Sequence, residues 1–178
     1  MKVNRLLNIF LLPSLAFMAA CTEEELGNDN AVATLFAGIE QQAATKTSLS
    51  GPTSGIYKTI WSGNDAIGVF VGENEASEFK LKKGDGTSKG EFQGVFKDLN
   101  GMSMSKTAVY PYSIIKGKSG STINVSLPAE QTYKEGNIAE EAYPMVAVTS
   151  GSELNFKNLC SVLRISMTGD LTVNSITF

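Results

Sequence analysis

The apolar residues of this chain form short stretches that alternate with polar residues and are separated by glycine-rich turns. From Val32 onward no window of about 11 residues carries the apolar stripe of an amphipathic helix. Several segments instead show the period of two that is typical of half-buried strands. In 78–82 this period places Phe79 and Leu81 on one face, and 122–127 alternates in the same way. Roughly ten such segments predict an all-β fold, either a sandwich or a barrel.

Two segments predict more specific features. Residues 67–71 are apolar except for a single glycine, which predicts a strand that is covered on both faces. The turn signal Ser-Gly-Asn-Asp at 62–65 stands between two apolar stretches, 56–61 and 66–71. We therefore expect these two stretches to pair as a hairpin.

The C-terminal part of the chain predicts two last strands, 163–167 and 171–178. In the second one the apolar parity shifts between Val173 and Ile176, which indicates a bulge. The sequence stops at Phe178 within this pattern, so we expect a C-terminally truncated domain or a strand that another segment completes. A sheet that lacks a strand has an open edge, which can accept a strand from a partner.

The first 20 residues follow a different pattern. Two basic residues precede an interrupted apolar run, and Cys21 follows directly. The run is too short for a good membrane span, so residues 1–20 are expected to form a secretory signal peptide. Residues 18–21 also resemble a bacterial lipobox, which implies that Cys21 carries lipid and becomes the N-terminus. The alternative is an ordinary signal peptide that is cut after an A-x-A-like site.

An acidic cluster follows the cysteine. It consists of Thr22, Glu23, Glu24 and Glu25. The cluster resembles the export signal that sends lipoproteins of the Bacteroidetes to the outer face of the outer membrane; a solvated acidic linker is the alternative. The whole segment 21–31 is polar and lacks periodicity, which predicts a flexible tether. This tether would hold a β-sandwich domain, 32–178, away from the membrane.

The composition excludes several kinds of function. Removal of the signal peptide takes two of the 15 basic residues, which leaves 13 against 18 acidic residues and a net charge of −5. No basic patch remains, so we expect no nucleic-acid partner. The chain has no histidine, which excludes histidine metal ligands and catalysis by a serine or cysteine with a histidine base. We therefore expect no enzyme activity, no metal site and no cofactor.

Two further candidates for chemistry have structural explanations. Cys160 lies in an apolar setting, which favours a small buried residue over a reactive thiol. Glu140 and Glu141 are adjacent, so in a strand their carboxylates would point to opposite faces. They would therefore not share a catalytic site.

Six short motifs follow one another along the chain. They are Thr-Lys-Thr-Ser at 45–48, Trp-Ser-Gly-Asn-Asp-Ala-Ile-Gly-Val-Phe at 61–70, Ala-Val-Tyr-Pro-Tyr-Ser at 108–113, Leu-Pro-Ala-Glu-Gln at 127–131, Pro-Met-Val-Ala at 144–147 and Phe-Lys-Asn-Leu-Cys-Ser-Val-Leu-Arg-Ile at 156–165. Together with the lipobox they resemble the fimbrillin-like (Mfa-like) surface lipoproteins of Bacteroides and its relatives. The resemblance implies a transthyretin-like, Greek-key β-sandwich that is usually the first of two domains.

Members of this family build, cap or anchor type V pili, which implies partner subunits of the same kind. A protease removes the first strand of the subunits after an arginine, and a strand of the next subunit fills the resulting groove. This chain has no arginine between Cys21 and Leu163, and Lys46 is a weak substitute. We therefore expect a retained, surface-anchored lipoprotein with a structural, adhesion or pilus-associated role through β-strand complementation.

The alternative function is the capture of host or bacterial glycans at the outer membrane, with exposed aromatic rings as the binding groups. The candidate rings are those of Trp61, Tyr110 and Tyr112. Each also has a structural explanation. Trp61 is expected to pack in the core against Phe70 and Tyr110, and Tyr110 and Tyr112 would form a packed strand end. Asp65 is expected to complete its own turn.

Overall fold

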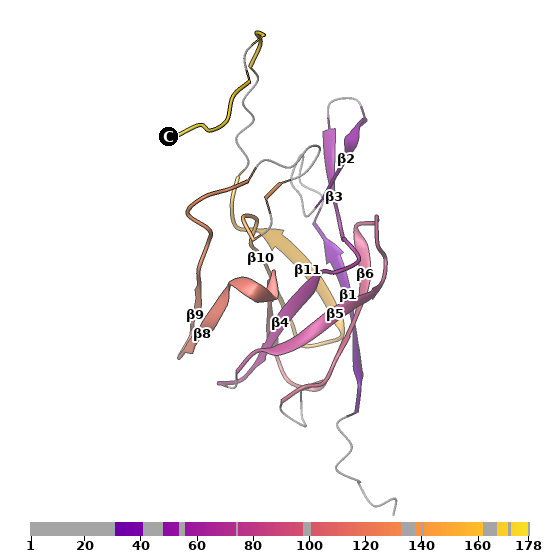
Figure 1. Cartoon of the computed structure of the whole chain (residues 1–178). Helices are drawn as coiled ribbons and strands as arrows, with labels where there is room; N and C mark the ends of the chain where they lie inside the picture. Colours follow the sequence, from indigo (N-terminus) through magenta and orange to yellow (C-terminus); the bar gives the residue numbers. More distant parts are fainter. Residues whose placement is uncertain are drawn as a thin grey trace, which may run out of the picture.

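The computed structural model describes residues 31–40, 48–53, 56–73, 75–97, 101–132, 138–139, 141–161, 167–170 and 172–177. All regular structure within these ranges is strand, apart from one 3-10 turn (Figure 1). The elements are β1 (Ala33–Ile39), β2 (Ser48–Thr53), β3 (Ile56–Ile60), β4 (Ala66–Val71), β5 (Ser77–Lys83), β6 (Lys89–Gly94), β7 (Lys106–Tyr110), η1 (Tyr112–Ile114), β8 (Ile115–Ser119), β9 (Thr122–Val125), β10 (Met145–Thr149) and β11 (Glu153–Asn158). The prediction of an all-β fold is confirmed.

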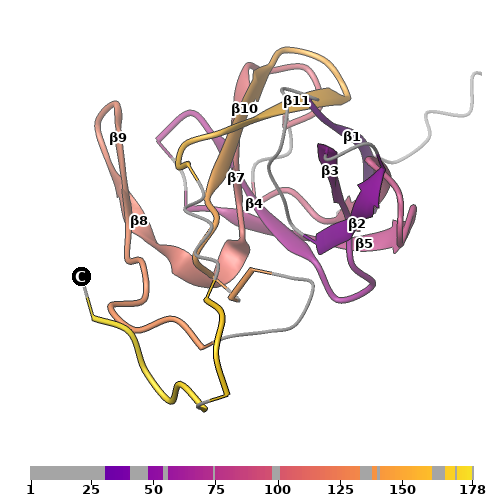
Figure 2. The same cartoon turned by 90° about the horizontal axis from the view of Figure 1, so that it is seen from above.

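Seven strands pair into one closed barrel in the order β1–β11–β10–β7–β4–β5–β6, and β6 pairs with β1 again. Neighbouring strands are antiparallel except for β1 and β11, which run parallel. The remaining strands form two hairpins, β2–β3 and β8–β9. The view from above in Figure 2 shows β8 and β9 on the outside of the barrel.

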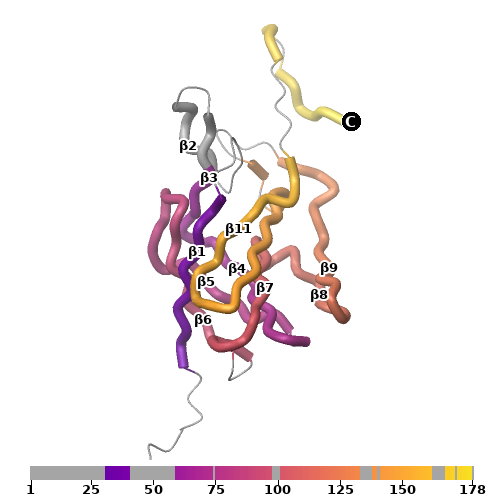
Figure 3. The backbone as a smooth tube through the Cα atoms, turned by 180° about the vertical axis from the view of Figure 1, so that it is seen from behind, coloured from indigo at the N-terminus to yellow at the C-terminus, as the bar shows by residue number. Residues whose placement is uncertain are grey.

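The family resemblance implies two stacked sheets, whereas these seven strands form a single ring. The difference comes from β1, which pairs with β6 on one side and with β11 on the other. Figure 3 shows β1 beside both strands. Inward and outward side chains alternate along the strands of sandwiches and barrels alike, so the sequence pattern does not distinguish the two.

The open sheet edge expected at the C-terminal end is absent from the part of the barrel that the structure describes, because every strand there has two neighbours. Residues 172–177 belong to the predicted last strand, but they lie outside the barrel and pair with no described strand (Figure 1). Val173 and Ile176 are exposed. The closed ring leaves this segment no free N–H and C=O groups to pair with. Of the predicted strand 163–167, only Met167 is among the described residues.

The hairpin predicted across 62–65 is wrong, because β3 pairs with β2, while β4 pairs with β5 and β7. The backbone of Trp61 explains the difference. Its N–H donates to the carbonyl oxygen of Thr87 (2.7 Å), and its own carbonyl accepts from the N–H of Gly86 (2.9 Å). These bonds tie the chain to the β5–β6 loop before it turns into β4.

The interior of the barrel is a continuous apolar core. Alternate residues of β1, β5 and β11 point into it. The predicted inward positions of Phe79 and Leu81 are confirmed, since these side chains are 0% and 8% exposed. The largest apolar side chains without exposed surface include Trp61, Phe79, Phe92, Phe156, Leu35 and Ile67. Burial of each such side chain stabilises the fold by roughly 1.5–3 kcal/mol.

A second, smaller apolar cluster covers the outer face of β4 and β7. Phe70 and Val109 face outward there. Tyr112 of η1, Ile115 of β8 and Ile123 of β9 pack over them. β4 is therefore buried on both faces, as its apolar run predicts.

Gly68 of β4 lies directly beneath this outer layer. A Cβ atom at residue 68 would overlap with Cδ1 of Ile115 and would lie 3.1 Å from Cδ2 of Tyr112. We expect Gly68→Ala to push η1 and β8 outward and to lower the free energy of unfolding by about 1–3 kcal/mol, measured by urea denaturation. The matched control is Gly151→Ala, where the nearest atom, Thr149 Oγ1, is 3.8 Å away. An equal loss in both variants would contradict the tight packing at Gly68.

Candidate functional site

The predicted lipid attachment site, Cys21, and the predicted export signal at 22–25 lie outside the residues that the structure describes. In the described part of the chain, no helix is long and apolar enough to cross a bilayer. The candidate ligand groups that the structure does describe are Trp61, Tyr110 and Tyr112. They lie in the barrel and in the layer outside it.

Trp61 belongs to the barrel core, and its side chain has no exposed surface. The three rings around it, each in edge-on geometry, are Phe92, Tyr110 and Phe156, with centroids 4.9, 5.5 and 5.6 Å away. Its Nε1–H donates a hydrogen bond to the carbonyl oxygen of Ala37 in β1 (3.2 Å). Trp61 therefore offers no ring face to a ligand. Phe70, which was also expected beside Trp61, lies in the outer cluster instead, because it faces away from the barrel interior.

Tyr110 connects the core to the turn before β4. Its hydroxyl donates to Oδ1 of Asp65 (2.9 Å), and the backbone N–H of Ser62 donates to Oδ2 of Asp65 (2.7 Å). Asp65 thus completes its own turn, as the sequence predicts. Burial raises the pKa of the Asp65 carboxyl group; the hydrogen bonds from Ser62 and Tyr110 oppose this rise, and the charge of Asp85 adds to it.

Tyr112 lines an open groove outside the barrel, between the β4–β5 turn and β8. The groove has a volume of about 310 Å³. The Tyr112 ring is half-buried because it packs against the outer cluster. The lining of the groove includes the exposed glutamates Glu73 and Glu75 and three lysines, Lys97, Lys116 and Lys118.

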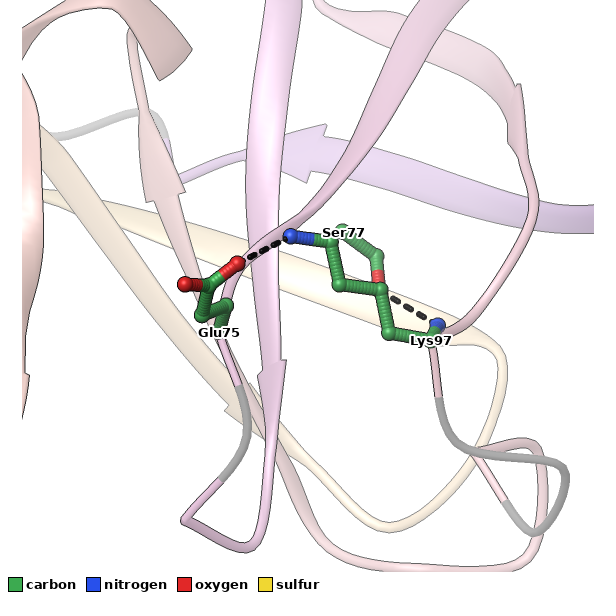
Figure 4. Close-up of polar contacts among 3 residues, drawn as sticks. All are labelled: Glu75, Ser77 and Lys97. Carbon is green, nitrogen blue, oxygen red and sulfur yellow. Dashed lines mark hydrogen bonds and ion pairs between the residues drawn. The ribbon is translucent and has the colours of Figure 1, made fainter.

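Two ion pairs already join charged groups of this groove. Nζ of Lys118 lies 3.5 Å from the carboxylate of Glu73. Lys97 pairs with Glu75 at 2.7 Å, and the Lys97 backbone N–H donates to Oγ of Ser77 at 2.9 Å (Figure 4). Solvent screens exposed ion pairs, so they add little to stability and their main effect is to position the β4–β5 turn.

A second hollow lies on the outer face of β1, β6 and β11, and the sequence analysis missed it. Its volume is about 370 Å³. Its lining residues include Phe36, Gly38, Lys83, Lys89, Glu91, Glu153 and Asn155. Phe36 is 49% exposed, whereas its neighbours Leu35 and Ala37 are buried. The sequence did contain a signal for this feature, namely an aromatic residue at an outward position of an alternating strand.

Cross-strand pairing places the polar groups of this hollow around Phe36. Phe36 pairs with Glu91 of β6 and with Glu153 of β11. Two residues further along β1, Gly38 pairs with Asn155 of β11. Side chains of directly paired residues lie about 5 Å apart. The hollow therefore has an aromatic side, a floor without a side chain at Gly38, and polar groups on its flanks.

Lys106 and Cys160 lie outside these two hollows. Lys106 is 1% exposed, and its ammonium group donates to the carbonyl oxygens of Gly151 (2.8 Å) and Met102 (3.2 Å). Burial lowers the pKa of this ammonium group. Sequence reasoning missed Lys106 because lysine is ordinarily exposed. Cys160, expected to be buried, is a half-buried free thiol.

The described residues contain no group of three or more acidic, histidine or cysteine side chains that could hold a metal ion.

Comparisons with known protein families, with curated proteins and with solved structures found no match to this chain. The described residues therefore define only the class, an all-β protein whose main body is a closed barrel.

We expect the stability of the fold to depend on the charge of Asp65. Its pKa is raised above 3.8 in the folded state, so the folded chain holds this proton more tightly than the unfolded chain. The resulting stabilisation is present below pH 3.8 and is lost as the pH rises through the folded-state pKa. Asp65→Asn has no carboxyl group that could lose a proton at this position. The free energy of unfolding of the variant minus that of the wild type, measured by urea denaturation, should therefore increase from pH 3 to pH 7.

The matched control for this pH series is Asp170→Asn, at an exposed position. Its stability should follow the wild-type pH dependence throughout. If Asp65→Asn also follows it, then the Asp65 carboxyl group is not perturbed by burial.

Proposed function

We propose that this protein is a surface-anchored, fimbrillin-like lipoprotein with a structural, adhesive or pilus-associated role and no enzyme activity. Its lipid would be attached at Cys21, and the segment 21–31 would hold the barrel on the exterior side of the outer membrane. The observation that supports this proposal best is the position of β1. It is the first described strand, and it closes the barrel.

The resemblance to fimbrillin-like subunits concerns this strand directly. Removal of β1 would open the ring between β6 and β11 and would uncover the core next to Leu35 and Ala37. The opened barrel would be one sheet folded into two layers, which is compatible with the transthyretin-like sandwich that we propose as the family fold. A strand of another subunit would fit this gap, because β6 and β11 would then have free hydrogen-bonding groups.

We propose that β1 nevertheless stays in place in this chain. No arginine stands between Cys21 and Leu163 at which the strand could be cut away. The hydrogen bond from Trp61 to Ala37 and the pairing on both sides also favour retention. A partner subunit would then use the outer edge of a hairpin, β2–β3 or β8–β9, where no described strand is paired.

Glycan capture is the second candidate function, and the hollow at Phe36 favours it. The three aromatic residues singled out in the sequence offer little ring surface, since Trp61 is fully buried and both Tyr110 and Tyr112 are half-buried. In this proposal the exposed ring of Phe36 takes their place.

The first test is the N-terminus of the mature protein. We expect mass spectrometry of the chain purified from outer membranes to show an acylated Cys21 with β1 present. We also expect a membrane-impermeant reagent to label the protein on intact cells. Cys21→Ser should release the chain from the membrane fraction, since the lipid supplies the anchor. An unacylated N-terminus near Lys46 would contradict retention of β1, and full protection from the label would contradict surface display.

A disulfide that locks β1 tests whether its removal is needed for function. Thr34 of β1 pairs with Gln93 of β6, and Nε2 of Gln93 lies 3.4 Å from Oγ1 of Thr34. This proximity makes Thr34→Cys/Gln93→Cys a suitable pair for a reversible cross-link. We expect the cross-linked protein to reach the cell surface and to associate with partner subunits at the wild-type level. The single variant Thr34→Cys is the control and should behave in the same way. A loss that a reducing agent restores would show that β1 must leave the barrel.

A further inference from the structure

Phe36 is the one exposed aromatic side chain among the residues whose burial the structure describes. A single exposed apolar residue needs no explanation by itself. Phe36 differs because it borders a hollow of about 370 Å³, which is within the range of small-molecule sites, about 300–1,000 Å³. Val148 is more exposed, at 68%, but it lines neither of the two hollows.

Gly38 forms the floor of this hollow. It lies on the same face of β1 as Phe36, two residues and therefore about 7 Å further along the strand. A Cβ atom at this position would lie 3.4 Å from Oδ1 of Asn155, so the amide group of Asn155 borders the floor. The absence of a side chain at Gly38 leaves room for a ring-shaped ligand beside the Phe36 ring.

The charges around the hollow balance. Lys83 and Lys89 contribute two positive charges, and Glu91 and Glu153 contribute two negative ones. Lys83 and Glu91 form an ion pair at 2.8 Å. The carboxylate of Glu153 and the amide of Asn155 are exposed. A hollow without net charge that offers acceptors and an amide favours a neutral ligand with several hydroxyl groups.

We propose that this hollow binds a neutral saccharide, with one sugar ring stacked on Phe36 and its hydroxyl groups bonded to Asn155 and Glu153. The face of an aromatic ring is negatively polarised and attracts the positively polarised C–H groups of a sugar. Amide and carboxylate groups at the flanks would fix the orientation of the hydroxyl groups. The site would accept a mono- or disaccharide unit of a longer chain, because the hollow is open to solvent.

The groove at Tyr112 is a weaker candidate for the same ligand. Its carboxylates Glu73 and Glu75 already pair with Lys118 and Lys97, so a sugar would have to displace these contacts. The Tyr112 ring is also half-buried, because it packs against the cluster of Phe70 and Val109. The hollow at Phe36 requires no such displacement at Asn155 or Glu153.

This inference deepens the second candidate function and rests on the proposed retention of β1, because Phe36 and Gly38 both belong to that strand. A subunit that lost β1 would lose the aromatic side and the floor of the site together. The test must therefore establish first that β1 is present, by the mass of the purified chain.

The experiment uses the full-length lipoprotein extracted in detergent and an array of neutral and acidic oligosaccharides, followed by titration calorimetry with the best neutral probe. We expect neutral glycans to bind. Phe36→Thr should raise Kd about tenfold or more, because it removes the ring on which the sugar stacks. Gly38→Thr should weaken binding at least as much, because its side chain fills the hollow. Both changes keep residues that favour strands and leave the inward face of β1 intact.

The matched control is Val148→Thr, which makes a similar change at an exposed position of β10 outside the hollow and should leave Kd unchanged. Urea denaturation of each variant separates a binding defect from a folding defect. With β1 present, the absence of any bound neutral glycan would overturn the saccharide site but not the anchored-lipoprotein proposal. The saccharide site would also be overturned if only acidic glycans bind. The same holds if neither Phe36→Thr nor Gly38→Thr changes Kd.

Discussion

The pairing of β1 with both β6 and β11 is the constraint on which the rest of the structure depends. This strand turns an open sheet into a ring, so each barrel strand in the described chain has two hydrogen-bonded neighbours. It also supplies the carbonyl oxygen of Ala37, which accepts the hydrogen bond of the fully buried Trp61. A buried indole N–H without a partner would cost about 1–3 kcal/mol, so the closure of the barrel and the position of Trp61 support each other.

The same strand carries the candidate binding surface. Its inward residues include Leu35 and Ala37, and its outward residues include Phe36 and Gly38. A shift of the pairing register by one residue would exchange the two sets, so the core and the hollow share one structural determinant. On the opposite side, the outer layer of η1, β8 and β9 covers β4 and β7 and leaves the face around β1 uncovered.

Local features of the fold could be predicted from the sequence, and long-range features could not. The all-β class, the inward positions of Phe79 and Leu81, and the turn completed by Asp65 depend on neighbouring residues. Closure of the ring depends on the parallel pairing of β1 with β11, whose residues lie far apart in the sequence. Residue type suggested the candidate aromatic rings, but exposure decides their role, and exposure follows from the three-dimensional arrangement.

The most direct test of this account is native-state hydrogen exchange of the β1 amides in the full-length protein, with β4 and β7 as internal references. If β1 is an integral strand that closes the barrel, then its amides should exchange only when the whole barrel unfolds. Their opening free energy should equal that of the β4 and β7 amides. Exchange of the β1 amides at a much lower opening free energy, while β4 and β7 remain protected, would show that β1 detaches by itself and would contradict the account.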